Sequence, residues 1–190
     1  MFITRYIRWA TITYWNYNKS NDKQFNCYEN SILVYQNLTN NSLNKRYDNK
    51  QYFNLSHIQS NIKEEDENHK RLFNLIGNGI ILTIDREEKK IRLDNRCDLN
   101  VYWTCPGLFY GSNQLDEKKF KSNKLKPNES NIIYDFKLIK LNENNISNNL
   151  IEFHVINISF GKCWGYNFKR KSLEYCPFWI NVSVNLDYFK

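Results

Sequence analysis

Residues 158–184, ISFGKCWGYNFKRKSLEYCPFWINVSV, hold the end of one strand-like run and a second such run, joined by a basic loop. In the second run Ile180, Val182 and Val184 alternate with polar residues, which is typical of a strand with one buried face. The first run, residues 151–160, is rich in the β-branched and aromatic residues that strands favour. The stretch therefore predicts two strands of a mainly β protein, with the intervening loop displayed at one end.

The loop carries a concentrated positive charge. Its four basic residues precede the first acid, Glu174, and they are Lys162, Lys169, Arg170 and Lys171. Gly161 and Gly165 permit unusual backbone angles. The aromatic residues between them and after them are expected to pin the loop to the body of the protein, and they are Trp164, Tyr166 and Phe168.

Such a loop suits a phosphate group. Arg presents a planar fork of donors and Lys a mobile point charge. A phosphorylated side chain brings about −1.5 to −2 charges and three acceptor oxygens. Charge alone leaves a second interpretation open, in which the loop is simply solvated.

Further strands are predicted outward from this stretch. Clusters of β-branched and aromatic residues occur at 8–17, 24–38 (centred on 31–35), 80–84, 91–93, 101–104 and 131–138. The charged turn at 85–90 makes a hairpin of the strands on either side of it. The polar, Asn-rich residues 40–49 and 140–149 predict loops.

One main helix is predicted between residues 61 and 76. Asn61 can cap it, the acidic residues 64–67 begin it, and Lys70, Arg71 and then Gly77 end it, which is the order that the helix dipole favours. Its apolar side is made of His69, Leu72, Phe73 and Ile76. The acidic run is either a partner contact or a solvated helix start. We expect a single domain over 1–190, with two antiparallel sheets packed face to face.

Composition narrows the class of protein. The 190 residues include 13 Tyr, 12 Phe and 5 Trp, enough for a sizeable core. The net charge of +7 favours an acidic partner: nucleic acid, an anionic membrane or a phosphoprotein. No segment approaches the roughly 18–20 apolar residues of a membrane span, so no membrane insertion is expected. Five Cys without a Cys-x-x-Cys pair predict reduced, mostly packed thiols in the cytosol or nucleus.

The sequence contains little that suggests catalysis. His57, His69 and His154 lack the spacing of metal ligands and are expected to be structural. Residues 76–79 follow a helix rather than a strand, which favours a helix stop over a dinucleotide fingerprint. Cys105 and Cys176 have no local base and are expected to pack. We predict no enzyme, no catalytic residue, no metal and no cofactor.

Ordered blocks of this sequence resemble the second Mad-homology domain, the carboxyl-terminal domain of the Smad family. In the stretch quoted above, the blocks are Lys162-x-Trp164-Gly165, then Arg170, then Cys176-Pro177-x-Trp179. Similar blocks occur at 9–15, at 60–62 and 76–80 around the helix, at 124–127 and at 134–136. The resemblance implies a β-sandwich with a loop-helix edge and a reduced helical bundle, in a signalling and transcription-regulatory module of the TGF-β/BMP pathway.

Three features are similar to the inhibitory Smads. Asp94-Asn95-Arg96 precedes Val101 as in that branch, and residues 136–158 are too few for the long paired helices of receptor-activated members. The chain also stops at Lys190 without the family's Ser-x-Ser tail. The resemblance therefore implies partners among phosphorylated type I TGF-β-family receptors or other Smad proteins, with transcription co-regulators in addition, and a location in cytoplasm and nucleus.

The motif positions also imply a site. Lys162 and Arg170 correspond to groove residues, Trp164 and Gly165 shape the loop, and Lys169 and Lys171 complete its charge. We expect no amino-terminal DNA-binding domain before Trp9 and no direct DNA binding.

The chain departs from the family at two positions. Cys163 replaces a Gly, and Glu64 or Glu65 stands where an Arg is usual. Two alternatives stay open: a co-regulatory or degenerate Smad-like scaffold without phosphate preference, and a nucleic-acid-binding domain suggested by the charge.

Overall fold

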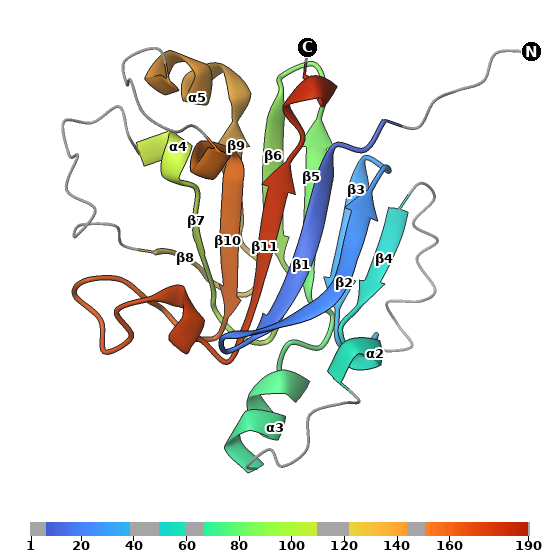
Figure 1. Ribbon diagram of the computed structural model, residues 1–190. Coiled ribbons are helices and arrows are strands. Elements are labelled where there is room, and N and C mark those ends of the chain that lie inside the picture. The colour runs from blue at the N-terminus through green and yellow to red at the C-terminus, as the bar shows by residue number, and fades with distance from the viewer. Residues whose placement is uncertain (1–6, 39–49, 60–66, 110–121, 144–150, 190) are drawn as a thin grey trace, which may run out of the picture.

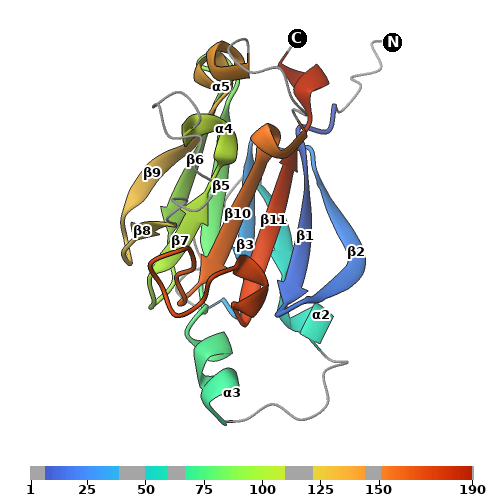
Figure 2. The ribbon, with the colours of Figure 1, turned by 60° about the vertical axis from the view of Figure 1, so that its left-hand side comes forward.

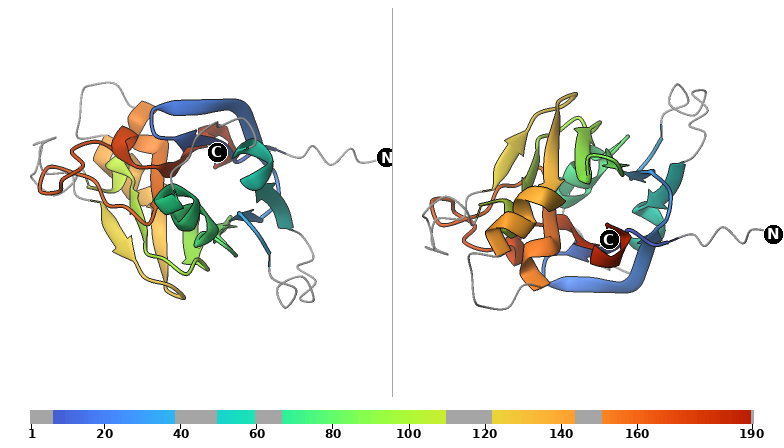
Figure 3. Two further views of the ribbon diagram at one scale, coloured as in Figure 1. Left: turned by 90° about the horizontal axis from the view of Figure 1, so that it is seen from below. Right: turned by 90° about the horizontal axis from the view of Figure 1, so that it is seen from above.

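The computed structural model describes residues 7–38, 50–59, 67–109, 122–143 and 151–189. These residues form two sheets packed against each other, which confirms the predicted mainly β sandwich (Figure 1). The six-stranded sheet has the order β2-β1-β11-β10-β7-β8, and the five-stranded sheet the order β4-β3-β5-β6-β9. Figure 3 shows the two sheets as the walls on either side of the core.

The strands of the six-stranded sheet are β1 (Ala10–Asn16), β2 (Lys19–Cys27), β7 (Val101–Thr104), β8 (Asn123–Leu125), β10 (Val155–Phe160) and β11 (Phe178–Val184). Those of the five-stranded sheet are β3 (Ser31–Tyr35), β4 (Lys50–Asn54), β5 (Ile80–Asp85), β6 (Lys90–Asn95) and β9 (Ser130–Asp135). The helical segments are α2 (Ser56–Gln59), α3 (Glu67–Asn74), α4 (Pro106–Phe109), α5 (Phe136–Glu143), η2 (Ile151–His154), η3 (Leu173–Tyr175) and η4 (Leu186–Tyr188).

Alternation along the central strands builds the core. Burial in β1 alternates with period two, and its inward residues pair across the sheet with those of β11: Ile12 with Val182, and Tyr14 with Ile180. These side chains are almost completely buried. The predicted strand at the end of the quoted stretch is therefore confirmed as the middle of the larger sheet.

The prediction of purely antiparallel sheets was wrong at one position. β3 and β4 pair in parallel, with Leu33 opposite Tyr52. The predicted loop 40–49, which connects them, lies outside the described residues. A parallel pair needs a connection that returns to the same end of the sheet.

Two of the predicted strand and loop boundaries were also wrong. Residues 136–143, predicted as the end of a strand and the start of a loop, form α5. Asp135 Oδ1 accepts from the Leu138 N–H at 3.1 Å and so caps this helix. Residues 151–154 form the 3-10 helix η2, and the strand β10 begins only at Val155. Ile139 of α5 is completely buried. Its packing in the core favours the helix more than the polar residues around it favour a loop.

The edge strand β2 was missed over most of its length. Its sequence, KSNDKQFNC, is polar and lacks alternation. It exists because it pairs with β1, from Asn16 opposite Lys19 to Ala10 opposite Cys27. An edge strand facing water can be polar, so composition did not reveal it.

The helix stop at 76–79 was predicted correctly. Gly77 and Gly79 have φ angles of +46° and +72°. Gly79 lies against the backbone of β3. A Cβ atom at this position would stand only 1.8 Å from the Val34 carbonyl oxygen, so only glycine fits. The turn holds α3 below the sandwich, at the same end as the loop 161–177; α4, α5 and η4 lie at the other end (Figures 1 and 2). Asn61 and residues 64–66 of the predicted helix lie outside the described residues.

Candidate functional site

The loop 161–177 leaves β10 in contact with α3. Gly161 has a φ of +76°, and its N–H donates to the Asn100 carbonyl at 2.8 Å. A Cβ atom at this position would lie 2.7 Å from Leu72 Cδ1. The absence of a side chain therefore lets the start of the loop pack directly on the helix.

Trp164 pins the middle of the loop, as predicted. It is 8% exposed and belongs to a small, largely aromatic cluster beside the main core. The other members of this cluster are Trp15, Tyr102, Leu173, Cys176 and Trp179. The buried hydroxyl of Ser122 donates to the Trp164 carbonyl at 2.9 Å. Tyr166 was expected to help, but it is 60% exposed and does not anchor the loop. Phe168 is half-buried.

The tip of the loop is closed by its own backbone. Gly165, with φ +128°, donates to the Arg170 carbonyl at 2.9 Å and accepts from the Phe168 N–H at 2.9 Å. Arg170 Nε donates to the Tyr175 carbonyl at 3.2 Å. The plane of the Arg170 guanidinium is thus held in place, while its Nη groups make no hydrogen bond to the described residues.

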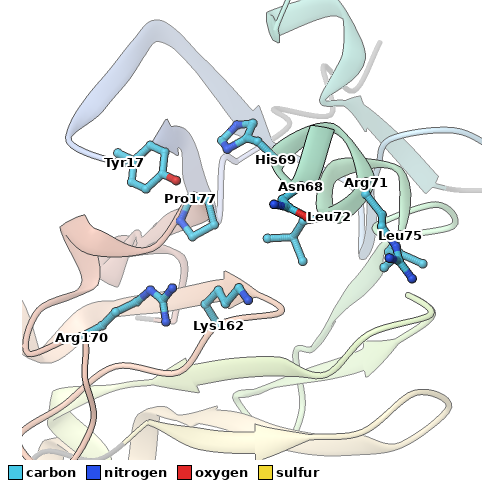
Figure 4. A pocket seen from close by; sticks show the side chains of 9 residues that line it. All are labelled: Tyr17, Asn68, His69, Arg71, Leu72, Leu75, Lys162, Arg170 and Pro177. Carbon is cyan, nitrogen blue, oxygen red and sulfur yellow. The ribbon is translucent and has the colours of Figure 1, made fainter. Parts of the chain in front are cut away.

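Lys162 and Arg170 meet in one cavity of about 430 Å³ between the loop and α3. Figure 4 shows them along one wall, with Tyr17 and Pro177 across from them and α3 closing the far side. The nine described residues that line it are Tyr17, Asn68, His69, Arg71, Leu72, Leu75, Lys162, Arg170 and Pro177. Three of these nine are cationic and none is acidic, so the cavity favours an anion. We call it the basic pocket.

Residues of the larger sheet fix α3 against the pocket. Asn16 at the end of β1 lies 3.4 Å from His69, from Nδ2 to Nε2. The His69 ring packs on the Phe178 ring with centroids 4.3 Å apart. The Phe73 ring also packs on Phe178, with centroids 5.1 Å apart. His69 therefore holds the helix in place, which agrees with the structural role predicted for it.

Tyr17 occupies a strained position at the rim of the pocket. It lies in the two-residue turn between β1 and β2 with a φ of +52°. A non-glycine residue in this left-handed region costs about 1–2 kcal/mol. Its N–H donates to the Pro177 carbonyl at 3.2 Å, and its own carbonyl accepts from Trp179 Nε1 at 2.8 Å. The surrounding structure thus holds Tyr17 in this conformation from both sides.

Two of the predicted loop cations lie apart from the pocket lining. Lys169 is exposed. Lys171 donates to the Tyr166 carbonyl at 2.6 Å and stacks over the Tyr166 ring at 5.6 Å. The sequence did not predict Arg71 as part of the site; it indicated only that Arg71 adds favourable charge at the helix end. No sequence signal marked Tyr17, Leu75 or Pro177 as neighbours of the loop.

Cys163 fits the loop without backbone strain. Its φ lies outside the left-handed region, unlike those of Gly161 and Gly165. Cys163 is half-exposed, whereas the other four thiols are buried, and all five are free. Burial raises the pKa of the Cys105 thiol to about 12 and also raises the pKa of Cys176. The expectation of free, mostly packed thiols is confirmed.

The described residues contain no group of three or more His, Cys, Asp or Glu side chains placed to hold a metal ion. None of the described helices is long and apolar enough to cross a membrane. The position of the usual family Arg, at Glu64 or Glu65, lies outside the described residues.

Comparison with known proteins identifies both a sequence family and a fold. A sequence model of the MH2 domain matches residues 7–185. The interferon regulatory factor 9 IAD domain superposes with a TM-score of 0.56 at 7% identity, covering 96% of this chain and 85% of that one. A chain from the structure of STAT2 in complex with IRF9 superposes with a TM-score of 0.59 at 6% identity, covering 96% and 94%. Because these identities are so low, the similarity shows a shared fold and nothing more.

Proposed function

The chain belongs to the MH2 domain family, a family of protein-interaction modules, and from this premise we propose that its basic pocket binds a phosphorylated protein partner. One observation carries the proposal. Lys162 and Arg170, which are separated along the loop sequence, line the same cavity as Arg71 of α3. Binding, and not catalysis, is the activity that this arrangement supports.

The chemistry of the pocket fits a phosphate ester. Arg170 is held through Nε, so its terminal nitrogens can donate to two phosphate oxygens at once. Lys162 adds a second positive charge from the same loop, and Arg71 a third from the helix. Charge-assisted hydrogen bonds of this kind contribute about 1.5–3 kcal/mol each.

We further propose that the protein is an inhibitory signalling and transcription-regulatory module of the TGF-β/BMP pathway. Its partners would be phosphorylated type I receptors or other Smad proteins, with transcription co-regulators in addition, and it would act in the cytoplasm and nucleus. The sequence blocks around Lys162 and Asn95 support this assignment, together with the small number of residues between positions 136 and 158.

A peptide titration tests the binding proposal. A receptor juxtamembrane peptide is titrated by calorimetry in its phosphorylated and unphosphorylated forms. We expect the phosphorylated form to bind at least about tenfold more tightly, because two or more charge-assisted hydrogen bonds depend on the phosphate. Equal affinity of the two forms would refute the proposal.

The neighbouring residues Arg170 and Lys169 supply a matched pair of variants. Arg170→Glu changes a pocket residue, and Lys169→Glu makes the same change of charge one residue away on the exposed surface. We expect Arg170→Glu to lower the affinity for the phosphopeptide by about tenfold or more, and Lys169→Glu by less than about threefold. Similar losses in both would indicate a diffuse effect of charge, as the nucleic-acid alternative requires.

A further inference from the structure

The loop 161–177 contains two cysteines, one near each end. Cys163 follows Lys162 and Cys176 precedes Pro177, so each cysteine adjoins a residue that lines the basic pocket. Cys163 is half-exposed, whereas Cys176 is completely buried, and both thiols are free. One accessible thiol and one protected thiol therefore belong to the same loop.

The thiol of Cys176 lies against the backbone of Cys163. Cys176 Sγ donates to the Lys162 carbonyl oxygen at 3.6 Å. That oxygen belongs to the peptide bond between Lys162 and Cys163, and in a trans peptide it lies about 2.8 Å from the next Cα. The Cys176 sulfur is therefore at most about 6.4 Å from the Cys163 Cα, and the Cα atoms of disulfide partners usually stand about 4.4–6.8 Å apart. Rotation of the Cys163 side chain with a small shift of the loop can close such a gap.

Electrostatic effects place the side chains together as well. Burial raises the pKa of the Cys176 thiol, and the neighbouring Cys163 raises it further, while Arg170 and Lys162 act in the opposite direction. Burial raises the pKa of Tyr102, and Cys163 adds to that effect too. Tyr102 packs on the small cluster that contains Cys176. Because such effects act over short distances, the Cys163 side chain lies near this cluster.

We propose that Cys163 and Cys176 are a reversible redox pair, which closes into an intramolecular disulfide on reaction with a low-molecular-weight disulfide. The accessible Cys163 thiolate attacks one sulfur of that reagent, forms a mixed disulfide and releases one small thiolate. The Cys176 thiolate then attacks the Cys163 sulfur and releases the second small thiolate. The two protein thiols lose two electrons to the reagent, and their two protons pass to the released thiolates.

The bond would join the two ends of the loop. Lys162 and Pro177, which line the basic pocket, would then be tied together through their neighbouring cysteines. The Cys176 thiol would also cease to donate to the Lys162 carbonyl. The inference does not depend on the proposed function, because it concerns the chemistry of the loop and not the ligand of the pocket.

Peptide mapping tests the bond directly, because trypsin separates the two cysteines. Cleavage after Lys162, Lys169 and Lys171 leaves Cys163 in peptide 163–169 and Cys176 in peptide 172–190. The folded full chain is incubated with glutathione disulfide, quenched with acid, digested without reductant and analysed by mass spectrometry.

At about 1 mM glutathione disulfide we expect the two peptides to be linked in most chains, because two neighbouring thiols have an effective concentration in the millimolar range or above. Dithiothreitol should separate the linked peptides. A persistent glutathione adduct on peptide 163–169, without the linked pair, would overturn the inference.

Three variants assign the partners. Cys176→Ser keeps a donor for the Lys162 carbonyl but removes the second thiol, and we expect it to accumulate the glutathione adduct on Cys163 at least about tenfold above the wild type. If this variant fails to fold, Cys163→Ser changes the half-exposed thiol instead and should give no linked pair. Cys105→Ser is the matched control, since Cys105 is buried and lies outside the loop, and it should form the linked pair as the wild type does. A linked pair that involves Cys105 would contradict the assignment.

Discussion

His154 Nε2 lies 2.5 Å from Glu143 Oε1, and both side chains are at most 5% exposed. Lys140 Nζ donates to the other carboxylate oxygen at 2.5 Å, and the Tyr134 hydroxyl lies 2.8 Å from His154 Nδ1. When His154 is neutral, both of its ring nitrogens have hydrogen-bond partners in this network. Nε2 donates to Glu143, and Nδ1 accepts the Tyr134 proton. The network joins α5, η2 and β9 at the end of the sandwich opposite the basic pocket.

This network makes stability depend on pH. Burial lowers the pKa of His154 despite the opposing effect of Glu143. Burial by itself raises the pKa of Glu143, but its hydrogen bonds with Lys140 and His154 outweigh burial, and the net pKa is lowered. Both groups bind protons more readily in the unfolded chain, so their contributions are lost as the pH falls.

We expect the free energy of unfolding to drop as the pH falls below the ordinary histidine value of 6.5, and further below the ordinary Glu value of 4.5. Urea unfolding at a series of pH values measures this drop. His154→Gln removes the titrating group, and a pH profile for this variant parallel to that of the wild type would refute the assignment.

Gly79→Ala should destabilise the protein severely. An added Cβ would meet the Val34 carbonyl oxygen at 1.8 Å and the backbone of Tyr35 at 2.7 Å, and neither can move without separating β3 from β5. We expect a loss of at least about 3 kcal/mol in the free energy of unfolding. Gly77→Ala is the matched control, because its nearest neighbour is Asn74 O at 3.8 Å and only the positive φ opposes it. Equal losses would show that φ alone matters.

Asn95→Ala should cost about 3 kcal/mol. The fully buried Asn95 donates to the carbonyls of Leu99 and Leu125 at 2.9 and 3.1 Å and accepts from the Cys97 N–H at 2.9 Å. Removing its amide leaves three buried backbone groups unsatisfied. Urea denaturation measures the loss, and a change no larger than that of the exposed substitution Asn167→Ala would contradict this role.

One thiol per chain should react rapidly with a disulfide reagent. Cys163 is half-exposed, whereas Cys27, Cys97, Cys105 and Cys176 are buried, and burial raises the pKa of each of these four thiols. Stopped-flow thiol titration under native conditions should give a single fast phase, absent in Cys163→Ser. A fast phase that persists in this variant would contradict the prediction.

Periodicity and residue type predicted most of the strands. The alternation at Ile180, Val182 and Val184 identified β11, and the charged turn after Ile84 identified the hairpin of β5 and β6. Elements whose state depends on pairing or packing were predicted wrongly: the polar strand β2 is held by its pairing with β1, and α5 by the core around Ile139. The composition of β2 and of α5 does not reveal these contacts.

The sequence by itself determined the sandwich class, the basic charge of the loop 161–177 and the residue types that can meet a phosphate. Only the tertiary structure decided which of those residues meet. Lys162 and Arg170 share the basic pocket, while Lys169 and Lys171 do not line it. Arg71 and Tyr17 join the pocket because Gly161 lets the loop touch Leu72, and because Asn16 and Phe178 hold His69. These contacts join residues far apart in the chain, and the packing of whole elements, not any local pattern, brings them together.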